Sequence, residues 1–447
     1  MQFLHKTRNN LQYLDAFICL LSFIASQRFF CPSLSVLVFF PLTLFTIFFF
    51  LQEKQMHGRF LPALLTLLLS IADEGGGQFS YSPAILIKIV ILSLFLLCIS
   101  RIKFSLGWKM IPCLFLIPPL VFFLLNKNTD QRTAYLCGIF SILFILIHSA
   151  KSFKYQISTA NFFKYSKLYL SPYIFGELLN IVAKYFGILS YEYLSYTSLK
   201  FLIIIPFILS IERGFIKESF FYGLATLIVL FEYQTRTIFI LTVLFTLFLV
   251  LERQIVKKRY LNILALFTSV FVFFKYLLPK IYQFNSKNFE LLISLSQSNF
   301  FSLNGIFNLF KSLDNYRFYE NKLFFSQSPQ FLIFGNGLGY KFPDTLNLVK
   351  LTNINDTAYS IAELQNSYIV SFHDSWVFFG VNFGLFFVIY VYGYLLVIMF
   401  DKKINNNTDL RRILGFLILI LLFFSYSKAT TYFIAFMFAA FLLPKKS

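Results

Sequence analysis

The histidine at the point where a polar stretch meets a long apolar run is the first candidate for chemistry. His373 lies in residues 372–376, between a phenylalanine and an aspartate. Its imidazole can take or give a proton near neutral pH, because the unperturbed pKa of histidine is about 6.5. A general base that activates a hydroxyl group needs this property. The alternative is that His373 only caps a helix at a membrane interface.

Two arginines could hold an anion near such a base, and Arg317 is the first. It falls in the middle of an apolar stripe if residues 306–324 form a helix. The other members of the stripe are Ile306, Phe310, Leu313 and Phe324. Since an apolar stripe packs inward, it carries the guanidinium to a place where an unpaired charge is costly. A bound anion would compensate this charge, and so would an ion pair with Glu320 three residues further on.

The second arginine, Arg236, opens an apolar run directly after a very short polar turn. A guanidinium at this position can bind phosphate oxygens with two hydrogen bonds at once. The alternatives are local pairing with Glu232 or extension of the side chain toward a membrane interface.

The elements that must position these residues are membrane helices. Of the 447 residues, 58% are hydrophobic and 13% are charged, whereas about 25% are charged in soluble domains. Apolar runs near the roughly 20 residues that cross a hydrocarbon core recur along the chain. We therefore predict an all-α polytopic membrane protein with about 14 transmembrane helices. The predicted spans are 11–25, 32–51, 59–71, 83–100, 109–125, 134–149, 172–189, 197–211, 217–232, 235–251, 260–278, 375–400, 411–426 and 428–443.

The distribution of lysine and arginine orients these spans. The connections between spans form two alternating sets, and one set holds most of the basic residues. The positive-inside rule places that set, together with both termini, in the cytoplasm. The net charge of +19 then reflects cytoplasmic loops rather than nucleic-acid binding. The span at 172–189 is the weakest, because it carries Glu177 and Lys184. Without it, one half of the chain would change sides and the basic residues would no longer gather on one side of the membrane.

This topology predicts three parts along the chain. Residues 1–278 hold transmembrane helices 1–11, residues 279–374 form one large periplasmic loop, and residues 375–447 hold helices 12–14. The longest cytoplasmic connection, near 150–171, is basic and aromatic and is expected to lie on anionic lipid headgroups.

Other polar motifs favour structural roles. The string Gly335–Gly339 lacks the lysine and the following helix of a phosphate loop, which favours a tight turn over a phosphate cradle. Residues 73–77 form either a divalent-cation site or a solvated turn. Gly380 and Gly384, four residues apart, predict close helix packing. Because the five cysteines lack metal-binding spacing, we expect no metal and no cofactor.

Taken in order, these strings resemble the superfamily of bacterial O-antigen polymerases and O-antigen ligases. An arginine opens an apolar span, and a large outer loop with a second arginine follows. That loop continues with the glycine-rich string from Pro329 to Gly339 and ends on a histidine just before a span. The resemblance covers about residues 230–400. Asp374, where the family usually has asparagine, and Asn382, at a position that is often acidic, depart from the ligase pattern.

The resemblance implies a metal-independent, GT-C-like glycosyltransferase of the bacterial inner membrane. Its substrates would be saccharides linked to undecaprenyl diphosphate. Arg236 and Arg317 would bind the diphosphate, and His373 would be the catalytic base. Tyr316 and Trp376 are candidates for stacking on sugar rings, and Asp374 is a candidate partner for His373.

We expect a polymerase that joins lipid-linked repeat units into O-antigen or capsular polysaccharide at the periplasmic face. The alternative within the class is the ligase that transfers finished glycan to lipid A-core. A lipid-oligosaccharide flippase, from a different class, would need charged groups deep in the spans, and few are present. The expected partners are the lipid-linked oligosaccharide, membrane lipids and a chain-length regulator, without nucleic acid.

Overall fold

The computed structural model describes residues 2–27, 33–52, 58–70, 102–104, 108–125, 128–153, 159–188, 200–233, 236–256, 315–345, 361–370, 372, 374–400 and 408–423. These residues are mostly helical, so the prediction of a helical chain is confirmed. Within these ranges, no helix is at once long enough and apolar enough to cross a membrane.

The chain folds into two compact units, and each unit combines two separate stretches. Met1–Ser100 and Gln156–Leu292 form the first unit, whereas Arg101–Tyr155 and Ile293–Ser447 form the second. The predicted division into residues 1–278, 279–374 and 375–447 refers to the membrane and stays a prediction.

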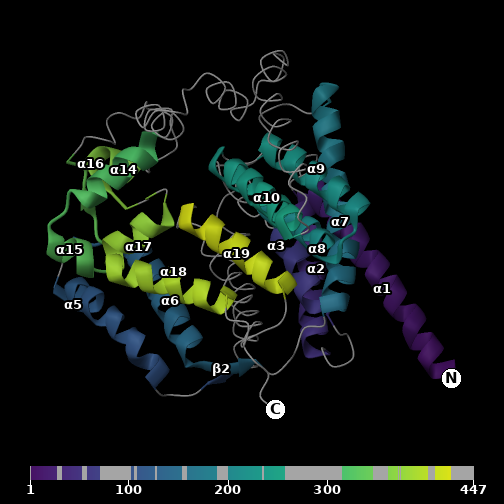
Figure 1. Ribbon diagram of the computed structural model, residues 1–447, viewed down its shortest axis with the longest axis horizontal. Helices are drawn as coiled ribbons and strands as arrows, with labels where there is room; N and C mark the ends of the chain where they lie inside the picture. The colour runs from purple at the N-terminus through teal and green to yellow at the C-terminus, as the bar shows by residue number, and fades with distance from the viewer. Residues whose placement is uncertain are drawn as a thin grey trace. The chain divides into compact units, whose positions relative to one another are not determined.

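The first unit is built from helices that coincide with predicted apolar spans. Its elements are α1 (Gln2–Ser26), α2 (Ser33–Leu51), α3 (Phe60–Ser70), α7 (Thr159–Tyr185), a 3-10 segment (Lys200–Ile204), α8 (Ile205–Arg213), α9 (Ile216–Tyr233) and α10 (Arg236–Val256) (Figure 1).

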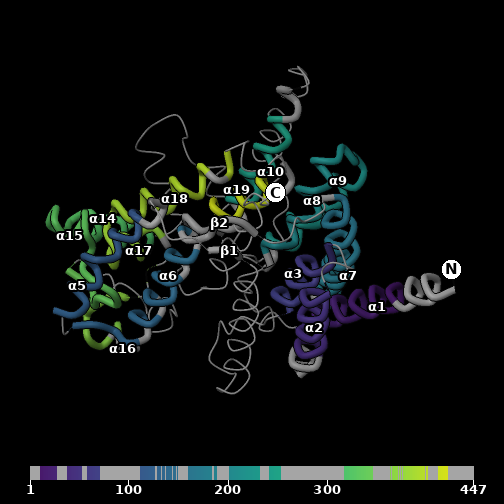
Figure 2. Tube along the Cα trace, turned by 90° about the horizontal axis from the view of Figure 1, so that it is seen from below, coloured from purple at the N-terminus to yellow at the C-terminus, as the bar shows by residue number. Residues whose placement is uncertain are grey.

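Helices α1 and α7 lie side by side (Figure 2). Polar side chains of α1 bond to carbonyls along α7: Ser22 Oγ donates to the Tyr169 carbonyl at 2.6 Å, and Gln27 Nε2 to that of Gly176 at 3.1 Å. Asn180 of α7 donates in return to the Ser26 carbonyl at 2.7 Å. The residue numbers of the bonded partners increase together along the two helices, so the helices run in the same direction.

Helix α7 begins well before the predicted span at 172–189. The sequence places residues 150–171 in a surface connection, but the structure continues the helix back to Thr159. Tyr169 and Leu170 are fully buried there, because this part of α7 packs against α1 and α3. Basic residues between the aromatic ones hide the apolar face of this part of the helix in the sequence. The membrane boundary of the span stays a prediction, because a helix can extend beyond a membrane.

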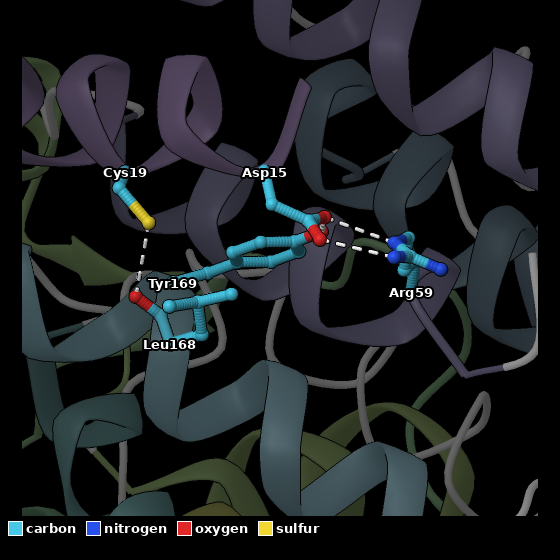
Figure 3. A network of polar contacts seen from close by, with 5 residues as sticks. All are labelled: Asp15, Cys19, Arg59, Leu168 and Tyr169. Atoms are coloured by element: carbon cyan, nitrogen blue, oxygen red, sulfur yellow. Dashed lines mark hydrogen bonds and ion pairs between the residues drawn. The ribbon is translucent and has the colours of Figure 1, made fainter. Parts of the chain in front are cut away.

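A buried ion pair joins α1, α3 and α7 (Figure 3). Arg59, just before α3, donates to both oxygens of Asp15 at 2.9 and 3.0 Å. The Tyr169 hydroxyl donates to Asp15 Oδ1 at 2.6 Å, and the Arg59 guanidinium lies 4.2 Å from the centre of the Tyr165 ring. Buried charges are tolerated when they are paired and hydrogen-bonded in this way. Three segments far apart in the sequence are thereby fixed to one another.

The second unit contains the candidate site. Its elements are β1 (Ile102–Phe104), a 3-10 segment (Trp108–Leu116), α5 (Ile117–Leu125), α6 (Gln131–Ser149), β2 (Ala150–Phe153), α14 (Asn315–Phe325), α15 (Pro329–Phe334), β3 (Phe342–Pro343), α16 (Ile361–Asn366), β4 (Tyr368–Ile369), α17 (Ser375–Phe383), α18 (Leu385–Phe400) and α19 (Thr408–Phe423). Strand β1 pairs with β2, and β3 pairs with β4, both antiparallel.

Helix α6 runs parallel to α17 and α18, and a series of aromatic contacts joins them. The ring of Phe140 lies 5.0 Å from that of Phe379, and the ring of Phe144 lies 4.8 Å from that of Phe387. One turn later, His148 Nε2 is 2.9 Å from the Tyr390 hydroxyl. His148 is therefore a buried packing residue, as expected for a histidine outside the site.

The predicted span at 375–400 is divided into two helices. Gly384 separates α17 from α18 and has a positive φ of 89°, a conformation that favours glycine. A β-carbon at Gly384 would also collide with the carbonyl oxygen of Ile333. The prediction of one continuous helix was wrong because this break is imposed by α15, which lies far away in the sequence.

Candidate functional site

An ion pair between α14 and the start of α17 forms the centre of the candidate site. Arg317 Nε lies 3.4 Å from Asp374 Oδ1, and the two side chains are 13% and 5% exposed. The contact is side-on, through Nε, and longer than the 2.7–2.9 Å of a strong charge-assisted hydrogen bond. The carboxylate thus compensates the charge of Arg317 inside the protein.

Asn321 fixes this pair from the same helix. Its Nδ2 atom donates to Asp374 Oδ2 at 3.0 Å and to the Arg317 carbonyl at 2.6 Å. Residues four apart lie on one face of a helix, so Asn321 and Arg317 reach the same carboxylate. Asp374, the residue just before α17, thus contacts Arg317 directly, and Asn321 holds that carboxylate in place.

Aromatic packing holds α14 on α17 beside the ion pair. The Phe324 ring lies on Gly380, where a β-carbon would come within 2.5 Å of Phe324 Cζ. The Trp376 ring packs against Phe324 at 5.5 Å and Phe325 at 5.8 Å. Phe324 and Arg317 share the inward face of α14, as the apolar stripe predicts. The predicted close approach at Gly380 is made by a phenylalanine ring of α14.

The glycine-rich string is a tight turn that ties this region to two other elements. Gly335, Gly337 and Gly339 all have positive φ angles. The Gly339 N–H donates to Asn382 Oδ1 at 2.7 Å, and its carbonyl accepts from the Asp130 N–H at 2.7 Å. The interpretation as a structural turn is therefore confirmed. The backbone N–H of Gly339 is therefore already occupied by a hydrogen bond within the protein.

Neighbouring residues extend the attachment of this turn. Tyr340 forms a bridge with Thr129, and the Lys341 N–H donates to the Asn128 carbonyl at 3.2 Å. Burial raises the pKa of the Tyr340 phenol above its ordinary value, so this group stays neutral at physiological pH. The segment around Tyr340 is thereby held to the short connection between α5 and α6.

The remaining predicted site residues are not brought together by described contacts. His373 lies outside the described residues, although its neighbours in the chain, Phe372 and Asp374, are both buried. Tyr316 belongs to α14 but its side chain is outside the description. Arg236 is the first residue of α10, in the other unit, and its side chain is likewise not described.

Two asparagines of the site were not predicted to have these roles. Asn321 could have been found as a polar residue one helical turn after Arg317. Asn382 carried no local signal for its role, because its partner Gly339 is 43 residues away. In the part of the chain that the structure describes, no cluster of histidine, cysteine and acidic side chains could hold a metal ion.

Comparisons with models of protein families, with curated proteins and with solved structures each found no match to this chain.

The arrangement is suited to stabilise negative charge at the start of α17. A nearly buried guanidinium is held in place by a carboxylate and an amide, so it needs little reorganisation to meet an anion. Asp374 is positioned to orient Arg317, whereas the sequence suggested that it orients His373. Only Arg317 and Asp374 of the predicted set are shown in direct contact.

Proposed function

We propose that this protein is a polytopic membrane glycosyltransferase that polymerises oligosaccharide repeat units linked to undecaprenyl diphosphate. The observation that carries the proposal is the Arg317–Asp374 pair, placed at the residue that follows His373 in the chain. Because Asp374 is the neighbour of His373 in the chain, we propose that Arg317 acts together with this candidate base at the start of a predicted span. The resemblance to O-antigen polymerases supplies the substrate class.

Exposed apolar stripes support the membrane part of the proposal. On α2, Phe40, Leu44, Phe48 and Leu51 are each at least 42% exposed and recur every three or four residues. A similar stripe on α7 consists of Phe175, Leu179 and Val182 and continues to Phe186 just after the helix, and one on α18 includes Phe386, Ile389 and Val397. In soluble monomers, contiguous apolar patches rarely exceed a few hundred Å². Lipid chains would cover such stripes.

Helix directions within each unit support the proposed topology. Helices α1 and α7 correspond to predicted spans 1 and 7, and α6 and α17–α18 to spans 6 and 12. Successive spans cross a membrane in alternating directions, so two parallel spans must both have odd numbers or both have even numbers. Spans 1 and 7, and spans 6 and 12, meet this requirement. About 14 spans, with both termini in the cytoplasm and residues 279–374 in the periplasm, remain our proposal.

Pairing between connections agrees with the same scheme. Strand β1 pairs with β2, and both belong to connections proposed to be cytoplasmic. The glycine-rich turn instead bonds to Asn128 and Asp130, in a connection proposed to be periplasmic. Segments that bond to one another must lie on the same side of a membrane, so these contacts support the assignment.

In the proposed reaction, an acceptor hydroxyl attacks the anomeric carbon of a lipid-linked saccharide. A new glycosidic bond forms while the bond from that carbon to the diphosphate oxygen breaks. Undecaprenyl diphosphate leaves with the electron pair, and Arg317 stabilises its charge. His373 accepts the proton of the attacking hydroxyl.

The test supplies purified full-length protein with a synthetic repeat unit on undecaprenyl diphosphate. A ladder of lengthened lipid-linked products supports the polymerase. Transfer to lipid A-core without lengthening supports the ligase alternative. Recovery of unchanged substrate, from protein that retains its native thermal unfolding, would contradict the proposal.

A further inference from the structure

One surface of the first unit combines cations with aromatic and aliphatic groups, all of them exposed or half-buried. It consists of Phe163 and Lys164 on α7 and Arg213, Phe215, Ile216 and Lys217 around the turn between α8 and α9. We call it the basic–aromatic platform. None of these residues belongs to the site proposed for glycosyl transfer.

Ring stacking builds the platform. The rings of Phe163 and Phe215 lie 5.6 Å apart at an angle of 19°. The Arg213 guanidinium lies 5.4 Å from the centre of the Phe163 ring. Gly214, with a positive φ of 75°, ends α8 and lets the chain turn at once into α9. The aromatic groups are therefore held in place by a defined turn.

The tip of the turn is exposed although it is apolar. Ile216 is 79% exposed and Phe215 is 47% exposed. Lys164 and Lys217 are exposed beside them. Side chains that insert into a lipid interface show this combination of apolar tips and flanking cations.

Acidic residues nearby do not cancel the positive charge. Lys167 pairs with Glu218 at 2.6 Å, so these two charges offset each other. Glu212 is the other acidic residue of the turn, so one carboxylate stands against the three cations Lys164, Arg213 and Lys217 in the count of charges. The surface keeps an excess of positive charge.

We propose that the basic–aromatic platform binds the headgroups of anionic phospholipids. Lysine and arginine contact the phosphate, while Phe215 and Ile216 insert among the upper parts of the acyl chains. The platform lies on connections that the proposed topology places in the cytoplasm, where the positive-inside rule gathers cations. This binding is independent of which glycosyl transfer the protein catalyses.

The experiment measures phospholipid binding to the purified full-length protein by native mass spectrometry. The probes are phosphatidylglycerol, which is anionic, and phosphatidylcholine, which is zwitterionic. Wild type is expected to prefer phosphatidylglycerol. The variant Lys164→Gln/Arg213→Gln/Lys217→Gln should lose roughly 100-fold in affinity, because each surface cation contributes about fivefold.

A matched control changes two lysines of the second unit, Lys322→Gln/Lys341→Gln, and should bind like wild type. Lys217→Gln alone, at an exposed position that folding does not require, should lose about fivefold. Equal affinity of the triple variant and wild type for phosphatidylglycerol would overturn the proposal. Equal binding of phosphatidylglycerol and phosphatidylcholine by the wild-type protein would also overturn the proposal.

Discussion

At the scale of single residues, Asp374 is expected to act through Arg317. Asp374→Asn leaves the nearly buried guanidinium without its carboxylate, which costs up to about 3 kcal/mol of stability. Polymer formation should fall at least tenfold, by about 1.4 kcal/mol or more in activation free energy. Rates of product formation and thermal unfolding of the solubilised protein measure the two effects.

Lys322→Ala is the control for this prediction, because Lys322 lies exposed on the same helix. A double variant that removes both Arg317 and Asp374 should be less destabilised than the sum of the single alanine variants, since neither member of the pair is then left without the other. Wild-type activity of Asp374→Asn would show that the pair does not position the catalytic cation.

The activity is expected to depend on the protonation state of His373. As a base it must be neutral, so activity should fall as pH drops through its pKa, near ~6.5 if unperturbed. His373→Gln keeps a hydrogen bond but accepts no proton in this range, so it should be inactive at normal protein levels. A pH–rate profile of wild type and the yield of His373→Gln measure this.

The control for His373 is His57→Ala, which should remain near normal. His148→Ala is less suitable, because His148 is buried against Tyr390 and its loss should destabilise the protein. Polymerisation by His373→Gln at the wild-type rate would reduce the histidine to a positioning group.

At the scale of elements, Gly384 is expected to control the junction of α17 and α18. Gly384→Ala introduces a β-carbon against the backbone of α15 in a conformation that disfavours alanine. We expect a loss of more than about 2 kcal/mol of stability, together with most of the activity, from combined strain and backbone displacement.

Gly393→Ala provides a matched control within α18. Nothing lies within 4 Å of a β-carbon built at Gly393, and alanine is the better helix former by up to about 1 kcal/mol. This variant should be neutral or more stable. Equal thermal unfolding of the two variants would mean that the break at Gly384 is dispensable.

The ion pair between α1 and α3 is expected to hold the first unit together. Arg59→Ala leaves Asp15 buried and unpaired, which should cost about 3–5 kcal/mol. Tyr169→Phe removes one hydrogen bond to the same carboxylate and should cost about 1–2 kcal/mol. Thermal unfolding measures both, and a smaller effect for Arg59→Ala than for Tyr169→Phe would contradict this ranking.

At the scale of the whole molecule, topology decides whether the proposed reaction can take place. Reporter fusions near Lys257 and Asn406 should give a cytoplasmic signal, and a fusion near Asn299 should give a periplasmic one. A cytoplasmic signal at Asn299 would contradict the proposed function, because the lipid-linked substrate is polymerised only at the outer side.

The sequence by itself determined where the helices lie. Apolar runs predicted α2, α3, α6, α9 and α19 to within a few residues, because burial or lipid contact selects apolar side chains along a continuous stretch. The inward direction of Arg317 also followed from helical periodicity alone, since Phe324 two turns away shares its face.

Only the tertiary structure decided which residues meet. The partners Arg317 and Asp374, Gly339 and Asn382, and Asp15 and Arg59 are dozens of residues apart, and no local pattern pairs them. The break at Gly384 has the same origin, because the backbone of α15 presses against it. Helical periodicity orients a side chain on its own helix, but contacts between distant segments depend on how the helices pack, and that packing made Asp374 the partner of Arg317.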